Sequence, residues 1–179
     1  PPLVILDEAY RDFADNPDCP DGVALLREHA RLIALRTFSK IAGLAGLRVG
    51  FGVAQPDIIR MLNRVRAPYN VNRLAQVAAV AALEDQRHWE RTRTVVREER
   101  LFLQAELERR GFGVVPSQAN FFLVKVGPQA GALRQSLERA GVLVRDGAVV
   151  GFPGHLRISI GTRAQNHKLL EALDRTARG

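Results

Sequence analysis

One lysine in this sequence lies among residues that commonly bind phosphate. Lys40 is one of only three lysines in the chain, and it follows an apolar run at residues 32–35. The hydroxyls of Thr37 and Ser39 precede it, and the guanidinium of Arg48 follows it. A lysine amine can form an imine with an aldehyde, while hydroxyl and guanidinium groups can hold a phosphate. The spacing therefore predicts a site for a phosphorylated aldehyde cofactor that Lys40 binds covalently.

A carboxylate and a phenol near the start of the sequence are candidates for the same site. Residues 3–6 have the apolar pattern of a parallel strand that is covered on both faces, and Asp7 and Tyr10 follow it. Ligands of open α/β sheets lie at the carboxyl ends of strands. A pyridine ring draws electrons when its nitrogen stays protonated, which requires a buried carboxylate, and Asp7 is the candidate. Tyr10 could donate a hydrogen bond to the ring oxygen. For Asp7 alone, an acidic turn or helix start is the alternative.

Two glycines after the lysine strengthen this interpretation. Gly43 and Gly46 would allow the backbone to approach a phosphate closely, although each could equally be a turn residue. A Ser-Lys pair is also common by itself. The combination of Asp-x-x-Tyr with Ser-Lys-x-x-Gly-x-x-Gly-x-Arg favours a cofactor site over separate structural roles.

Strands and helices alternate along the chain, which predicts a mixed α/β protein. A helix over residues 74–83 is apolar nearly all round and is expected to be buried. A long helix over residues 85–110, ended by Gly111, is expected to connect to a second, smaller α/β unit. The strands are expected at residues 3–6, 32–35, 49–54, 113–115, 120–126, 142–145 and 156–160. The other helices are expected at residues 23–30, 55–65, 129–140 and 164–177.

The net charge of +7, from 26 basic and 19 acidic residues, raises nucleic acid as a partner. The densest basic region, residues 87–110, is interleaved with glutamates, as is typical of a solvated helix face. The sequence shows no recognisable nucleic-acid motif, so we expect no nucleic-acid partner, although a basic nucleic-acid binder stays as an alternative. A basic site would equally suit a small anionic substrate.

Several other features limit the class of protein. No apolar run approaches the roughly 20 residues that span a bilayer, and no signal-like segment is present, so we expect a cytoplasmic protein with no membrane partner. Cys19 is the only cysteine, which excludes an internal disulfide or a cysteine metal cluster. The four histidines lack metal-ligand spacing, and no metal is expected. Because domains rarely begin inside a central strand, the natural chain is expected to be longer.

Two stretches resemble the pyridoxal-phosphate aminotransferases of fold type I, and most closely the histidinol-phosphate aminotransferases. They are residues 4–10, which read Val-Ile-Leu-Asp-Glu-Ala-Tyr, and residues 37–51, which hold the lysine, the glycines and the arginine. The similarity continues through residues 67–72, 117–121 and 156–162, so it covers nearly the whole chain.

The resemblance implies a fold, a cofactor and a set of roles. Residues 1–83 would be the C-terminal part of the large cofactor domain, with a mostly parallel sheet, and residues 84–179 a small C-terminal α/β domain. The cofactor would be pyridoxal 5′-phosphate. Lys40 would hold it covalently and move a proton between the substrate α-carbon and the cofactor C4′. Asp7 would pair with the ring nitrogen and Tyr10 with the ring oxygen. The residues that would bind the cofactor phosphate are Thr37, Ser39 and Arg48.

The resemblance also implies substrate contacts in the second half of the chain. Arg157 would grip the substrate carboxylate, or the corresponding end of an amino alcohol, because arginine binds carboxylates in bidentate geometry. Arg145 matches a position linked to the substrate phosphate, and an ordinary surface arginine is the alternative. Asn120 would shape the wall of the site, or is simply a polar residue at the start of a strand.

The expected function is transamination of histidinol phosphate with 2-oxoglutarate in histidine biosynthesis, by a full-length protein that is a homodimer and takes small amino and oxo acids. A related aromatic amino acid aminotransferase and a threonine-phosphate decarboxylase are alternatives, and an inactive truncated module is an alternative of another class. The glycine/serine phosphate loop, the aromatic that stacks on the ring and the asparagine to the ring oxygen have no counterpart in these residues.

Overall fold

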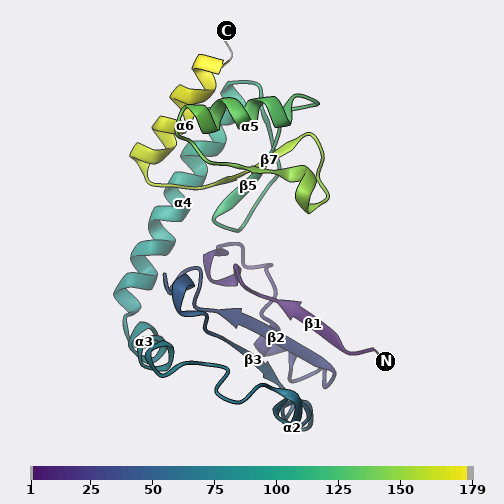
Figure 1. The fold of residues 1–179 in the computed structure, drawn as a ribbon. Coiled ribbons are helices and arrows are strands. Elements are labelled where there is room, and N and C mark those ends of the chain that lie inside the picture. Colours follow the sequence, from purple (N-terminus) through teal and green to yellow (C-terminus); the bar gives the residue numbers. More distant parts are fainter. Residues whose placement is uncertain (1, 177–179) are drawn as a thin grey trace. The chain divides into compact units, whose positions relative to one another are not determined.

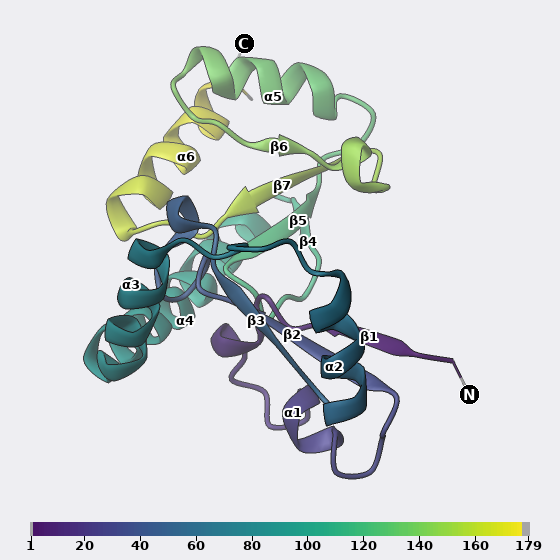
Figure 2. The ribbon, with the colours of Figure 1, turned by 60° about the horizontal axis from the view of Figure 1, so that its bottom comes forward.

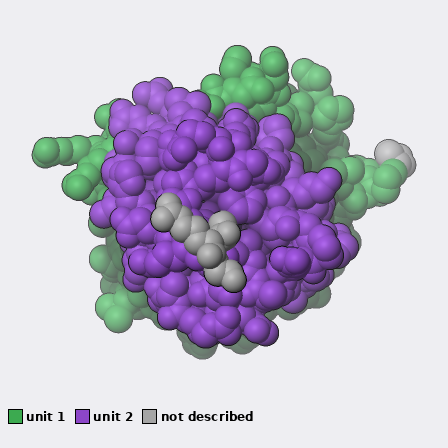
Figure 3. Space-filling model, turned by 90° about the horizontal axis from the view of Figure 1, so that it is seen from above, with its two compact units in different colours: residues 1–93 green, residues 94–179 purple. Residues whose placement is uncertain are grey.

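The computed structural model describes residues 2–176. The contacts within the chain divide it into two compact units, residues 1–93 and residues 94–179, which Figure 3 shows in different colours. The expected domain boundary between residues 83 and 84 stays a prediction. Within the described residues, no helix is both long and apolar enough to cross a membrane.

The first unit is built on a three-stranded sheet in the order β1-β2-β3 (Figure 1). β1 runs parallel to β2, with Asp7 beside Leu35, whereas β3 runs antiparallel to β2, with Gly50 beside Thr37. The carboxyl ends of β1 and β2 therefore meet at one edge of the sheet. The elements are β1 (Val4–Asp7), η1 (Arg11–Phe13), α1 (Gly22–Leu25), β2 (Leu32–Thr37), η2 (Ala45–Leu47), β3 (Gly50–Ala54), α2 (Pro56–Val65) and α3 (Arg73–Glu84). The helix α4 (Gln86–Arg109) begins in this unit.

Local sequence explains where several helices begin. Asp21 caps α1, because its carboxylate accepts hydrogen bonds from the amides of Val23 and Ala24. Asn72 caps α3 in the same way by accepting from the amide of Ala75. α2 begins at Pro56, as expected, because proline suits the first turn of a helix. The helix expected at residues 23–30 is only four residues long.

A small apolar core packs behind the loop that follows β2. Buried side chains of the segment between β2 and β3 contact the alanine stripe of α3, which consists of Ala75 and Ala79. Trp89 of α4 packs against the same cluster and donates its indole N–H to the carbonyl of Ala82 over 2.7 Å. The buried members from the loop and its flanks are Phe38, Ala42 and Val49.

Two burial predictions are wrong for the described chain. α3 is not buried all round, because only its small alanine stripe is covered while Leu74 and Val77 are 75% and 61% exposed. In β1, Val4 and Ile5 are also more than half exposed. An apolar pattern indicates that a surface favours burial, but none of the described residues covers these side chains.

The second unit is an antiparallel sheet in the order β4-β5-β7-β6, and Figure 2 shows β7 between β5 and β6. Alternate strand residues point to opposite faces. One face of the sheet and the helices share an apolar core. Its buried side chains are Leu103, Leu107, Phe122, Val124, Leu137, Leu156, Ile158, Leu169, Leu170 and Leu173. The elements after α4 are β4 (Gly113–Val114), β5 (Phe121–Lys125), α5 (Ala130–Arg139), β6 (Arg145–Asp146), η3 (Gly147–Val150), β7 (His155–Ser159) and α6 (Arg163–Thr176).

The expected boundaries of the second unit are mostly close to the observed ones. α4 ends just before Gly111, whose φ of +82° favours glycine. The strand expected at residues 142–145 begins only at Arg145, where pairing with β7 starts. The expected end of the last helix, Ala177, lies outside the described residues. The mixed α/β class is confirmed.

Candidate active site

Lys40 is presented by a well-anchored turn at the end of β2. The amide of Phe38 donates to the carbonyl of Val49 over 3.2 Å, and the amide of Leu44 donates to the carbonyl of Phe38 over 2.9 Å. The amide of Gly43 closes the turn by donating to the carbonyl of Lys40 over 3.0 Å. The next residue after the lysine, Ile41, is fully buried, whereas Lys40 is half-buried. The chain is therefore fixed on one side of the lysine, and its amine is left accessible.

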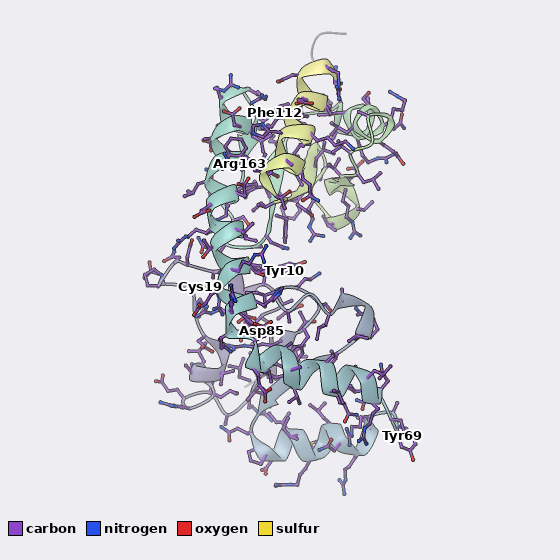
Figure 4. The ribbon with its side chains drawn as sticks, turned by 90° about the vertical axis from the view of Figure 1, so that its left-hand side faces the viewer. Tyr10, Cys19, Tyr69, Asp85, Phe112 and Arg163 are labelled. Carbon is purple, nitrogen blue, oxygen red and sulfur yellow. The ribbon has the colours of Figure 1, made fainter. Side chains whose placement is uncertain are left out.

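Five of the predicted cofactor residues share one hollow of about 270 Å³ at this edge of the sheet. They are Asp7, Thr37, Ser39, Lys40 and Arg48. Tyr10, which Figure 4 labels, lies beside this group, and its ring centroid is 5.1 Å from the Nζ atom of Lys40. This distance is within the range of a cation–π contact. The structure thus brings together all six residues that the sequence and the resemblance placed around the cofactor.

The hydroxyl and guanidinium groups of the hollow suit a phosphate. The Oγ1 of Thr37 accepts a hydrogen bond from the amide of Ser39 over 3.0 Å. The Nη1 of Arg48 lies 3.4 Å from the Oγ of Ser39 and donates to the carbonyl of Ala45 over 2.8 Å. Arg48 has a φ of +54°, in the left-handed region that non-glycine residues rarely adopt. A cation and two hydroxyls within one small hollow are the groups that bind an anion, so these residues fit the cofactor phosphate.

Asp7 accepts a hydrogen bond from the amide of Ala9 over 3.0 Å and faces the hollow. Its side chain is exposed rather than buried, because the described residues leave this side of the hollow open. The carboxylate still lies in the same hollow as Lys40, which is the placement that a ring-nitrogen partner needs.

The sequence reasoning missed three charged residues beneath this site. Glu8 is only 6% exposed, and its Oε2 accepts a hydrogen bond from the Nε of Arg36 over 3.1 Å. Its Oε1 accepts from the amide of Gly22 over 2.7 Å. The Nη2 of Arg36 donates to the Oδ1 of Asp21 over 2.8 Å. The available signal was the charge of Glu8 and Arg36, which stand at the ends of two apolar strands.

Two residues of this cluster, Arg36 and Asp21, have shifted pKa values. Partial burial by itself would lower the pKa of Arg36, but the hydrogen bond and the charge of Glu8 outweigh it and raise that pKa. Partial desolvation would raise the pKa of Asp21, but the amide of Val23 and the charge of Arg36 lower it below its ordinary value. Arg36 and Asp21 are thus both stabilised in their charged forms.

The three predicted substrate residues form a separate group in the second unit. Arg145 and Arg157 lie directly opposite each other on β6 and β7. The guanidinium carbon of Arg157 lies 4.0 Å from the ring centroid of Phe121, which is a cation–π contact. Asn120 precedes β5, and its carbonyl accepts a hydrogen bond from the amide of Ile160 over 2.9 Å. Two arginines and an aromatic ring on one sheet face suit an anionic substrate.

This fold and this lysine site define a class of protein, the pyridoxal-phosphate aminotransferases. Residues 2–173 match the family model for aminotransferase class I and II, and the chain belongs to this family. The family resemblance inferred from the sequence is confirmed.

The relatives are more specific. The chain is 49% identical over 172 residues to the histidinol-phosphate aminotransferase of Moorella thermoacetica, covering 96% of this chain and 45% of that protein. It is 47% identical over 174 residues to the histidinol-phosphate aminotransferase of Anaeromyxobacter sp., covering 97% of this chain and 48% of that protein. The chain thus spans about half the length of the curated relatives it matches.

Solved structures agree with these relatives. The histidinol-phosphate aminotransferase of Clostridium acetobutylicum matches with a TM-score of 0.90 and 26% identity, over 97% of this chain and 54% of that one. The histidinol-phosphate aminotransferase of Sinorhizobium meliloti, solved in complex with pyridoxal-5′-phosphate, matches with a TM-score of 0.87 and 29% identity, over 98% of this chain and 49% of that one. The L-threonine-O-3-phosphate decarboxylase of Porphyromonas gingivalis has a TM-score of 0.83 and 28% identity, over 99% of this chain and 55% of that one.

Proposed function

We propose that the full-length protein catalyses transamination with pyridoxal 5′-phosphate, and that Lys40 is its catalytic lysine. The observation that carries the proposal is the hollow that places Lys40 beside Tyr10 and among a carboxylate, two hydroxyls and an arginine. When bound, this cofactor supplies an electron-withdrawing ring that makes the α-hydrogen of an amino compound acidic.

Each residue of the hollow has a defined role in this proposal. Lys40 holds the cofactor through its Nζ and carries the proton that leaves the substrate α-carbon. Asp7 keeps a proton on the ring nitrogen through its negative charge. Tyr10 donates a hydrogen bond to the ring oxygen. The phosphate is bound by Thr37, Ser39 and Arg48.

The proposed substrates are histidinol phosphate and 2-oxoglutarate. The names of the relatives at 47–49% identity support this choice. Arg157 would bind the carboxylate of the oxo acid, Arg145 the phosphate of the donor, and Asn120 would shape the wall beside them. We further propose that the full-length protein is a cytoplasmic homodimer of histidine biosynthesis, with residues 1–83 in its cofactor domain and residues 84–179 in its small domain.

A second candidate is decarboxylation of threonine phosphate. The fold similarity to the decarboxylase of Porphyromonas gingivalis favours it. Threonine phosphate carries both a phosphate and a carboxylate, which are the groups that Arg145 and Arg157 would bind. The same arginines would suit both substrates, but the reactions differ in their products.

The test is an assay of the full-length protein with each substrate. With histidinol phosphate and 2-oxoglutarate we expect glutamate to form, whereas threonine phosphate should release no carbon dioxide. Lys40→Ala should abolish glutamate formation, while Lys168→Ala, the matched control at a lysine outside the hollow, should retain it. Release of carbon dioxide without glutamate would replace the proposal by the second candidate.

A further inference from the structure

The cluster of Glu8, Arg36 and Asp21 lies directly behind two residues of the proposed cofactor site. Glu8 follows Asp7, and Arg36 precedes Thr37. Glu8 does not line the hollow, whereas Arg36 stands at its border between Leu35 and Thr37. The Glu8 carboxyl group lies beside Gly22 and on the same side of the sheet as Ala34. A Cβ atom at residue 22 would be 3.0 Å from the Glu8 carboxyl carbon and 3.0 Å from the Cβ of Ala34.

Backbone hydrogen bonds pair β1 with β2 up to their carboxyl ends. Asp7 is the last paired residue of β1, and the next bond across is the amide of Glu8 donating to the carbonyl of Leu35 over 2.9 Å. The Asp7 carboxylate accepts a hydrogen bond from the amide of Ala9, within its own turn, and this bond does not join β1 to β2. Thr37 likewise bonds to Ser39, within its own loop.

The side chains of Glu8 and Arg36 add a second connection beyond the backbone. Their ion pair joins the end of β1 to the end of β2, and the Glu8 side chain is 4% exposed. Both carboxylate oxygens of Glu8 are bonded, one to Arg36 and one to the amide of Gly22. The fork of Arg36 also reaches Asp21, which caps α1. A buried and fully bonded charge pair has one favoured geometry, and removing one partner leaves the other uncompensated.

We propose that Glu8 and Arg36 are positioning residues that fix the separation between Asp7 and the Thr37–Ser39 segment. This inference rests on the proposed function. The cofactor has a rigid pyridine ring and a short phosphate ester arm, so its ring nitrogen and its phosphate must be held at the same time by groups from two different strands. A change in the separation of the strands therefore weakens a ligand that bridges both ends more than a ligand that uses one end.

The test compares two probes in the full-length apoprotein, pyridoxal 5′-phosphate and pyridoxal, which lacks the phosphate. Their dissociation constants are measured from the visible absorbance that develops on binding. In Glu8→Gln and Arg36→Gln we expect the constant for pyridoxal 5′-phosphate to rise at least about tenfold, and that for pyridoxal to rise much less. Arg36→Lys keeps the charge but loses the fork, so its effect should be intermediate. Arg60→Gln is the control, because Arg60 pairs with Asp57 on the exposed surface of α2.

The outcomes separate this inference from the proposed function. A wild-type protein that binds neither probe overturns both. A wild-type protein that binds the cofactor, with variants that lower the melting temperature but keep the wild-type ratio of the two dissociation constants, overturns only the positioning role. If the Gln variants fail to fold, the same ratio measured in Arg36→Lys decides, and an unchanged ratio again refutes the proposal.

Discussion

The chemical role assigned to Lys40 depends on the residues around it, because a lysine alone is a common surface residue. The half-buried amine lies 5.1 Å from the centroid of the Tyr10 ring and shares a hollow with Asp7, Ser39 and Arg48. The turn behind it is buried at Ile41 and Ala42, so the lysine extends from a fixed backbone. Preorganisation of this kind is what a covalent cofactor requires of its lysine.

At the same scale, Arg145 should determine the preference for a phosphorylated donor. In the full-length protein, Arg145→Ala should raise the KM for histidinol phosphate by roughly 10- to 100-fold, the range expected for losing a hydrogen bond between charged groups. Histidinol, which lacks the phosphate, should be affected much less. Arg139→Ala, an exposed arginine on α5, is the control. Equal losses for the two donors would show that Arg145 does not contact the phosphate.

The elements place these residues through a few local constraints. Gly43, in the turn that Lys40 begins, has a φ of +73° and open space around its Cβ position. Gly46 has similar open space without a positive φ. The two glycines therefore differ in backbone conformation and not in packing.

We expect Gly43→Ala to lower the free energy of unfolding by about 1 kcal/mol relative to Gly46→Ala, because a Cβ disfavours the left-handed region. Chemical denaturation of the two variants measures this difference. If the two variants are equally stable, the turn does not hold Gly43 in the left-handed conformation.

A second constraint at this scale joins the end of α4 to α6. Arg110 makes a bidentate ion pair with Asp174, through bonds of 2.7 and 2.9 Å, and also binds Glu106. Hydrogen bonds from Arg109 and then from Arg110 lower the pKa of Glu106 from 4.5 to about 2. A carboxyl group with a lower pKa in the folded chain stabilises the fold above its unfolded pKa and loses this contribution as the pH falls.

The stability difference between wild type and Glu106→Gln should therefore be constant above about pH 5 and shrink between about pH 4.5 and 2. Urea denaturation at a series of pH values measures it, with Glu98→Gln at an exposed position of α4 as the control. A difference that does not change with pH would mean that Glu106 is not held as an ion by the two arginines.

The pattern of apolar residues and the positions of proline and glycine predicted the elements that the site needs. Apolar runs located β1 and β2, Pro56 located the start of α2, and Gly111 located the end of α4. The Glu8–Arg36 pair was not predicted, because contact between residues that are 28 positions apart leaves no local pattern.

At the scale of the whole molecule, the described chain leaves several large apolar side chains uncovered. Val77 and Val80 of α3 are 61% and 58% exposed, on the side of the helix away from Ala75. The apolar pattern predicted that this helix is buried, and the described chain leaves Val77 and Val80 exposed. The sequence could not show which chain segment or copy covers them. The matched relatives are about twice as long as this chain.

Exposed apolar patches of this kind favour association. For the 179-residue chain, Val77→Lys combined with Val80→Lys should reduce self-association in sedimentation velocity while leaving the melting temperature within a few degrees of wild type. Ala79→Lys, at a buried position of the same helix, should instead lower the melting temperature. Unchanged self-association of the double variant would show that the chains associate through a different surface.

The central claim is that Lys40 holds the cofactor, and its most direct test is to locate the bond. The full-length protein is incubated with pyridoxal 5′-phosphate, reduced with borohydride so that the bond becomes permanent, digested and analysed by mass spectrometry. We predict that the added mass lies on Lys40 at close to one cofactor per chain, and that Lys40→Ala carries none. Stoichiometric attachment at Lys125 or Lys168, or equal labelling of the Lys40→Ala variant, would contradict the account.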